Sequence, residues 1–107
     1  MTVDPTKDPV LVRFRAALEV AYGERIARVV LFGSRAWGDA RPDSDYDIAL
    51  FLNDMDSLGR EARVLAKVGT DVLLATGAVI NALPLPAHAL ADRTGFMLEM
   101  RRDGLAI

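Results

Sequence analysis

Residues 31–50 read LFGSRAWGDARPDSDYDIAL, and the interpretation of the whole chain depends on this stretch. It begins inside a nearly continuous apolar run, residues 26–32, which only Arg28 interrupts and which is typical of a strand buried on both faces. Residues 33–45 contain two glycines, a proline and several polar side chains, so we predict a loop with room for one helical turn. Residues 46–52 then predict a second strand.

The residues after the first strand carry the chemistry. Gly33 lets the backbone approach a ligand closely, and a strand that turns into helical geometry points several N–H groups at one place, which suits a phosphate. Ser34 adds a hydroxyl donor there. Asp45 and Asp47 share one side of the second strand, roughly 6.5–7 Å apart, where like charges repel. One or two Mg²⁺ ions would relieve this repulsion, so the pattern indicates phosphoryl or nucleotidyl transfer.

Each half of this pattern also has a simpler interpretation. Gly33-Ser34 alone is compatible with an ordinary turn, and Asp45 with Asp47 alone is compatible with the solvated start of a strand. Their combination behind a buried strand favours a functional site. The two glycines of the loop have P-loop spacing, but residues 39–40 are Asp-Ala where a P-loop needs Lys and Ser or Thr, so we exclude a P-loop.

Gly-Ser, ten further residues and Asp-x-Asp resemble the nucleotidyltransferase superfamily that includes DNA polymerase beta. The resemblance covers about residues 29–52 and is strongest to the minimal members, which often pair with helical HEPN proteins as toxin–antitoxin modules. Arg35, Gly38 and residues 39–44 also resemble those members. The resemblance implies a small nucleotidyltransferase fold with a short mixed sheet and helices packed on it.

The resemblance also implies roles for these residues. Gly33 and Ser34 would hold the triphosphate of ATP or another nucleoside triphosphate, while Asp45 and Asp47 would bind Mg²⁺ and act in catalysis. Arg35 is a further candidate nucleotide-binding residue, with a plain surface role as the alternative. A hydroxyl would attack the α-phosphate and pyrophosphate would leave, which most simply transfers AMP from ATP. The chain is short, so we expect a HEPN-type partner or a homodimer to supply the acceptor.

The sequence departs from the family at a third carboxylate, expected on the strand after the second long helix. Asn81 or Ala82 occupies this position, and residues 78–91 contain no Asp or Glu. Asparagine can ligate a metal through its carbonyl oxygen, but it cannot act as a base. Asp71 and Asp43 are the candidate replacements. A catalytically inactive nucleotide-binding or partner-binding module is therefore the alternative function.

The remaining elements follow from periodicity and capping. Asp8-Pro9 starts a helix that Gly23 ends. A long helix covers residues 58–76, a third strand covers residues 79–83 and is stopped by prolines, and a last helix covers residues 95–102. The side chains predicted to face inward are Leu11, Phe14, Leu18, Ala21, Ala62, Leu65, Val72 and Leu73. The order of elements predicts a small α/β layer sandwich.

Three single residues are interpreted from their immediate sequence neighbours. Trp37 lies in a glycine-flanked loop, and we favour local core over an exposed partner contact. Tyr46 alternates with the aspartates along its strand, so we predict a packing role. His88 has no second histidine near it, so we interpret it as a surface or capping residue rather than a metal ligand.

Length, charge and composition limit the domain number and the function classes that the chain can have. With 107 residues we expect one domain, residues 1–107. The net charge is −2, which argues against a primary nucleic-acid binder. There are no cysteines, which excludes disulfides, thiolate catalysis and cysteine zinc sites. Residues 1–10 do not resemble a signal peptide, and no apolar run is long enough to span a membrane, so we expect a cytoplasmic protein.

Overall fold

The computed structural model of the chain describes residues 4–107. The predictions that include residues 1–3, on the N-terminal segment and the domain bounds, lie partly outside that range. In chain order the elements are η1 (Pro5–Lys7), α1 (Pro9–Tyr22), η2 (Gly23–Arg25), β1 (Ile26–Phe32), α2 (Ser34–Trp37), β2 (Tyr46–Leu52), α3 (Leu58–Thr76), β3 (Ile80–Pro86), η3 (Ala87–Ala91), α4 (Gly95–Asp103) and β4 (Leu105–Ala106). The two predicted long helices and the first two strands are confirmed within a residue.

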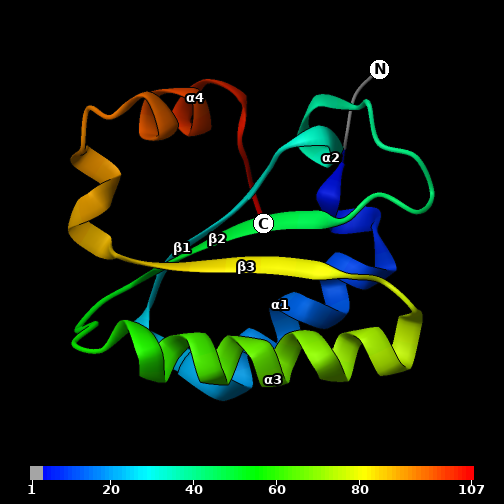
Figure 1. Cartoon of the computed structure of the whole chain (residues 1–107), viewed down its shortest axis with the longest axis horizontal. Helices are drawn as coiled ribbons and strands as arrows, with labels where there is room; N and C mark the ends of the chain where they lie inside the picture. The colour runs from blue at the N-terminus through cyan, green and yellow to red at the C-terminus, as the bar shows by residue number, and fades with distance from the viewer. Residues whose placement is uncertain (1–3) are drawn as a thin grey trace.

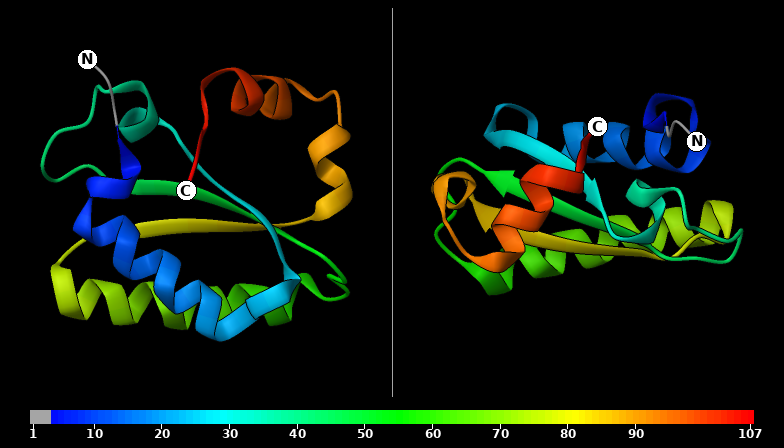
Figure 2. Two further views of the ribbon diagram at one scale, coloured as in Figure 1. Left: turned by 180° about the vertical axis from the view of Figure 1, so that it is seen from behind. Right: turned by 90° about the horizontal axis from the view of Figure 1, so that it is seen from above.

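The four strands form one mixed sheet in the order β3-β2-β1-β4. β1 is antiparallel to β2 and to β4, and β2 is parallel to β3. Helices α1 and α3 lie together on one face, below the strands in Figure 1, while α2 and α4 lie on the other. Figure 2 shows α1 and α3 side by side as one layer. This arrangement confirms the small α/β layer sandwich with a short mixed sheet.

Strand alternation divides the core into two clusters. Tyr46, Ile48 and Leu50 of β2 point to the α1/α3 face and are buried in the larger cluster. Ala49 and Phe51 point to the opposite face and pack in a smaller cluster under η3 and α4. We call these the closed face and the open face of the sheet, because helices cover the second one only in part (Figure 1).

The prediction that Pro84 and Pro86 stop the third strand is wrong. β3 continues to Pro86 and pairs with β2 along its whole length. The N–H of Tyr46 donates to the Val79 carbonyl at 2.9 Å, so the odd-numbered residues of β3 direct their backbone groups toward β2. The even-numbered residues, which include both prolines, face the free edge of the sheet, where a missing N–H costs no ladder hydrogen bond.

The C-terminal strand was not predicted. Leu105 and Ala106 pair with Leu31 and Val30 of β1, and a two-residue strand is too short to give a periodic signal. β4 covers only this part of β1, so Ala27 and Arg28 near the start of β1 are exposed. The prediction that β1 is buried on both faces therefore holds only for its second half.

Several inward-facing predictions need correction. Leu11, Phe14 and Leu18 of α1 and Leu65 and Val72 of α3 are buried, as predicted. Ala21, Ala62 and Leu73 are exposed instead.

Tyr22 and Glu61 take the core positions that the helical pattern assigned to their neighbours. Glu61 is tolerated there because its carboxylate pairs with the Arg25 guanidinium. Burial raises the pKa of Tyr22 to about 12.

Of the three predictions for single residues, two are confirmed and one is wrong. Tyr46 is buried, as predicted. Trp37 is 51% exposed, so the preference for local core is wrong. It ends α2, a single turn that projects beyond the sheet. His88 is exposed in η3, as predicted. Across residues 4–107, no helix combines the length and the apolar character needed to cross a bilayer.

Candidate active site

Gly33 forms the turn between β1 and α2. Its φ of 73° lies in the region that favours glycine, and its carbonyl accepts the N–H groups of Ala36 at 3.1 Å and Trp37 at 3.2 Å. A Cβ atom at Gly33 would overlap the Asp47 carboxylate, which lies directly against the turn. The turn expected to hold phosphate and the strand expected to hold metal are therefore in contact, and only glycine fits between them.

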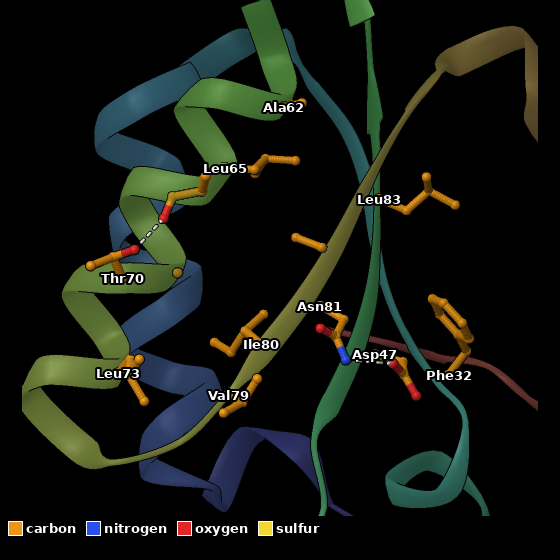
Figure 3. A pocket seen from close by; sticks show the side chains of 13 residues that line it. Phe32, Asp47, Ala62, Leu65, Thr70, Leu73, Val79, Ile80, Asn81 and Leu83 are labelled. Carbon is orange, nitrogen blue, oxygen red and sulfur yellow. Dashed lines mark hydrogen bonds between the residues drawn. The ribbon is translucent and has the colours of Figure 1, made fainter. Parts of the chain in front are cut away.

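Asp45 and Asp47 lie at the start of β2 on its open face, and Asn81 of β3 is paired with Asp47 in the sheet register. The Asn81 amide nitrogen donates to Asp45 Oδ2 at 3.1 Å and to Asp47 Oδ1 at 3.4 Å. Figure 3 shows this amide directed at Asp47. Of the two candidate positions for the third carboxylate, Asn81 and not Ala82 therefore faces the aspartates. Its two N–H groups offset the repulsion between the carboxylates.

The donor set of this site suits a hard cation. The two carboxylates supply oxygen ligands of the kind that Mg²⁺ prefers, while the Asn81 amide presents its nitrogen to them. Within residues 4–107, no three His, Asp or Glu side chains cluster together. Asp43 is exposed in the turn at residues 41–44, and Asp71 pairs with Lys67 at 3.1 Å on α3. Neither residue replaces the third carboxylate.

Arg35 organises the loop that leads to Asp45. Its guanidinium donates to the Ser44 carbonyl at 2.7 Å and 3.0 Å, and to the carbonyls of Arg41 and Pro42 at 3.3 Å. Its central carbon lies 3.9 Å from the centre of the Tyr46 ring, a cation–π contact. Arg35 thus fixes the chain immediately before the first aspartate, and its contact with a nucleotide stays a prediction.

Tyr46 ties the site to the closed face. Its hydroxyl donates to Asp8 Oδ2 at 2.7 Å, and the other oxygen of Asp8 caps α1 by accepting the Val10 N–H at 2.9 Å. Burial, with the hydrogen bond to Asp8 as a second cause, raises the pKa of Tyr46 to about 12. Tyr46 lies between the two aspartates in sequence, so this anchor also sets their position on the strand.

A groove of about 500 Å³ opens beside the aspartates. Asp47, Asn81 and Phe32 line its end at the site, and residues of α3 and β3, apolar except for Thr70, line the rest (Figure 3). A second hollow, of about 230 Å³, is lined by Gly33, Trp37 and Phe96 together with the acidic residues Glu99 and Asp103. Phe32 lines both cavities, and the Gly33 turn borders the second.

Comparison with known proteins agrees with this geometry. A sequence profile of the family described as "Polymerase beta, Nucleotidyltransferase" matches residues 18–82, more than half of the chain. The chain belongs to this nucleotidyltransferase family. The match confirms the resemblance based on Gly33-Ser34 and Asp45-x-Asp47.

Two relatives of this chain come from Methanocaldococcus jannaschii. The candidate protein adenylyltransferase MJ0604 is 40% identical over 70 residues, which are 65% of this chain and 64% of the relative. The candidate protein adenylyltransferase MJ0141 is 24% identical over 98 residues, which are 92% of this chain and 95% of the relative. The chain thus spans less than two thirds of MJ0604.

Solved structures share the nucleotidyltransferase fold. A candidate nucleotidyltransferase from Sulfolobus solfataricus aligns with a TM-score of 0.64 and 16% identity, covering 91% of this chain and 75% of the other. A toxin–antitoxin crystallised with AMP-PNP gives 0.64 and 19%, covering 89% and 69%. A mutant of the toxin–antitoxin MntA-HpeT gives 0.61 and 14%, covering 96% and 71%. At these identities the likeness shows the fold alone.

Two features of the candidate site were missed from the sequence. The hydrogen bond from Tyr46 to Asp8 joins residues 38 positions apart, and no local pattern signals it. The groove along α3 has a weak signal: Ala62, Ala66 and Leu73 widen the apolar stripe of the helix beyond what the core uses.

Proposed function

We propose that this nucleotidyltransferase transfers a nucleoside monophosphate, AMP from ATP, to a hydroxyl group in a Mg²⁺-dependent reaction. The contact between the Gly33 turn and the Asp47 carboxylate carries the proposal, because it joins a phosphate-binding turn to a pair of cation ligands. The names of the two relatives, both candidate protein adenylyltransferases, support AMP as the transferred group.

Each site residue has a defined part in this reaction. Gly33 and Ser34 bind the triphosphate through backbone N–H groups and a hydroxyl, with Arg35 positioned at the same loop. Asp45 and Asp47 hold Mg²⁺, which supplies neutralisation of the phosphate charge. The acceptor oxygen forms a bond to the α-phosphorus, the bond to the β-phosphate breaks, and pyrophosphate leaves. Asn81 cannot accept the hydroxyl proton, which passes to an aspartate or to water.

The structural neighbours support a proposal for the acceptor and the partner. Two of those neighbours are toxin–antitoxin structures, one of them with AMP-PNP. We propose that this chain works as the antitoxin half of such a pair, with a HEPN-type protein as partner and acceptor. A homodimer is the other assembly in which a second chain supplies the acceptor.

One observation favours a second candidate function. Asn81 donates to both aspartates, and in this way takes over part of the charge compensation that a cation would supply. A chain with this arrangement could bind nucleotide and partner without turnover. The measurement that separates the two functions is transfer in the presence of the partner.

The first experiment is calorimetric titration of the protein with ATP, with and without Mg²⁺. We expect Mg²⁺-dependent binding that is lost in Asp45→Asn/Asp47→Asn. Transfer of labelled AMP to the partner should fall at least about a hundredfold in the same variant, since the cation ligands are neutralised.

The matched control is Asp54→Asn/Asp56→Asn, which neutralises two exposed carboxylates of the same spacing beyond the other end of β2. This control should bind ATP and transfer AMP like the wild type. Equal transfer by the Asp45/Asp47 variant would contradict the proposed reaction. If none of the four nucleoside triphosphates binds the wild type, the nucleotide site itself is contradicted.

A further inference from the structure

The groove beside the aspartates runs along the free edge of the sheet. β3 is the terminal strand, and the residues that line the groove include Ala66 and Leu73 of α3 and Ile80 and Ala82 of β3. The same groove ends at Asp47 and Asn81 (Figure 3). A molecule bound along β3 would therefore reach the carboxylates without crossing another element.

The backbone of β3 favours an extended occupant. Val79 accepts the Tyr46 N–H, and the alternation along the strand then directs the N–H and C=O groups of Ile80 and Ala82 away from β2. Unpaired edge groups of this kind are a template for strand addition. Two residues farther on, Pro84 and Pro86 have no N–H to offer, so the edge can donate to an added strand only at its start.

The side chains of the groove select the chemistry of the occupant. Leu73 is 42% exposed, Val79 is 44% exposed and Leu83 is 39% exposed, and all three line this one groove. The residues that line the groove include no Lys or Arg, and its one charged member is Asp47. A polyphosphate backbone would find no counter-charge here, whereas apolar side chains of a polypeptide would be buried.

We propose that this groove binds the acceptor as an extended polypeptide segment, which adds a short strand beside Ile80 and Ala82 and presents a hydroxyl side chain to Asp47. The proposal rests on the proposed function and names its substrate class. The segment alternates apolar residues, which enter the groove next to Leu73 and Val79, with residues that face solvent or the site.

The experiment follows peptide binding separately from transfer. The probe is a pool of decapeptides, each with one central Tyr, Ser or Thr flanked by mixed apolar and charged residues, and a second pool with N-methylated backbone amides. We expect the unmethylated pool, without ATP, to slow hydrogen exchange of the Ile80 and Ala82 amides at least tenfold. With ATP and Mg²⁺, the apolar-rich peptides of the unmethylated pool should be labelled. The N-methylated pool should neither slow amide exchange nor be labelled.

Two variants of adjacent residues provide the control. Leu73→Arg places a charge in the groove, while Leu74→Arg changes a side chain on α3 that is 80% exposed and does not line it. Leu73→Arg should abolish amide protection and reduce peptide labelling at least tenfold with ATP binding unchanged. Leu74→Arg should behave like the wild type.

The outcomes separate the two proposals. Unchanged exchange at Ile80 and Ala82 with millimolar peptide, or full labelling by Leu73→Arg, would overturn the groove as the acceptor site while ATP binding remained intact. Protected amides without any labelling would support the groove as a peptide site and count against the transfer reaction.

Discussion

The two faces of the sheet differ in how completely they are covered. The closed face buries Tyr46, Ile48 and Leu50 of β2 under α1 and α3. The open face buries Ala49 and Phe51 of the same strand, but only under η3 and α4, and it leaves the aspartate end of the strand accessible. β2 thus supplies core residues to both faces, and on the open face it also carries the candidate site.

This difference shows how a short chain combines stability with a charged site. The carboxylates repel one another, and that cost has to be met by packing elsewhere in the fold. Because side chains alternate along a strand, Tyr46 and Ile48 can be packed without restricting what Asp45 and Asp47 contact. Changes on the closed face should therefore affect unfolding, and changes on the open face should affect binding.

The largest expected effect tests this separation with one truncation on each face. Leu50→Ala removes a fully buried side chain from the closed face and should lower the free energy of unfolding by about 3 kcal/mol. Leu83→Ala, at a position 39% exposed on the open face, should cost less than about 1 kcal/mol. Urea unfolding measures both, and equal losses would contradict the division into two faces.

A smaller effect concerns the charge of the site. Asn81→Asp adds a third carboxylate beside Asp45 and Asp47, so it should tighten Mn²⁺ binding about tenfold, equivalent to about 1.4 kcal/mol. Without metal the added repulsion should lower the melting temperature.

Asn53→Asp is the control for this change. It adds the same charge roughly 20 Å away at the far end of β2, beyond the range of screened electrostatics, and should leave Mn²⁺ affinity unchanged. Calorimetry with Mn²⁺ measures the affinity of both variants. Equal tightening in both would show that the net charge, and not the position of the added carboxylate, is responsible.

The smallest effect concerns the anchor between the faces. Tyr46→Phe keeps the buried ring and loses the hydrogen bond to Asp8, which should cost about 1 kcal/mol. The pKa of Tyr46 is raised to about 12, so its contribution to stability is fully present below about pH 10, the unfolded value, and is lost as the pH rises toward 12.

Unfolding followed from pH 8 to 12 tests this dependence. The wild type should lose stability above pH 10 more steeply than Tyr46→Phe, with the remaining slope coming from Tyr22, whose pKa is also raised to about 12. Identical slopes in the two proteins would contradict the role of the Tyr46 hydroxyl.

Local sequence signals predicted most of the fold because its long elements are strongly marked. Asp8 and Ser57 cap the two long helices, and Gly23 and Gly77 end them, so those bounds could be derived directly. The two missed features of the sheet depend on tertiary pairing. From sequence alone, proline predicts the end of a strand, because the side of the strand that faces the free edge of the sheet is not known. β4 forms only because one side of β1 is not paired with β2.

The candidate site was predicted as a set of residues but not in its geometry. The family signature predicts Gly33, Ser34, Asp45 and Asp47 as site residues, and the structure brings the turn and the second aspartate into contact. The choice between Asn81 and Ala82 required the register of β3 against β2, which a one-residue slip would invert. The exposure of Trp37 depends on how far α2 projects from the sheet, which its own sequence does not encode.

The two prolines of β3 have a consequence for self-association. An exposed, hydrogen-bonding sheet edge invites identical molecules to stack into growing fibrils, in which every strand pairs with the next. Pro84 and Pro86 remove the donors from half of the outward-facing positions of this edge. The remaining donors suffice for one short added strand, but they cannot form a continuous hydrogen-bond ladder with further copies of the chain. The prolines should therefore protect this exposed edge from aggregation.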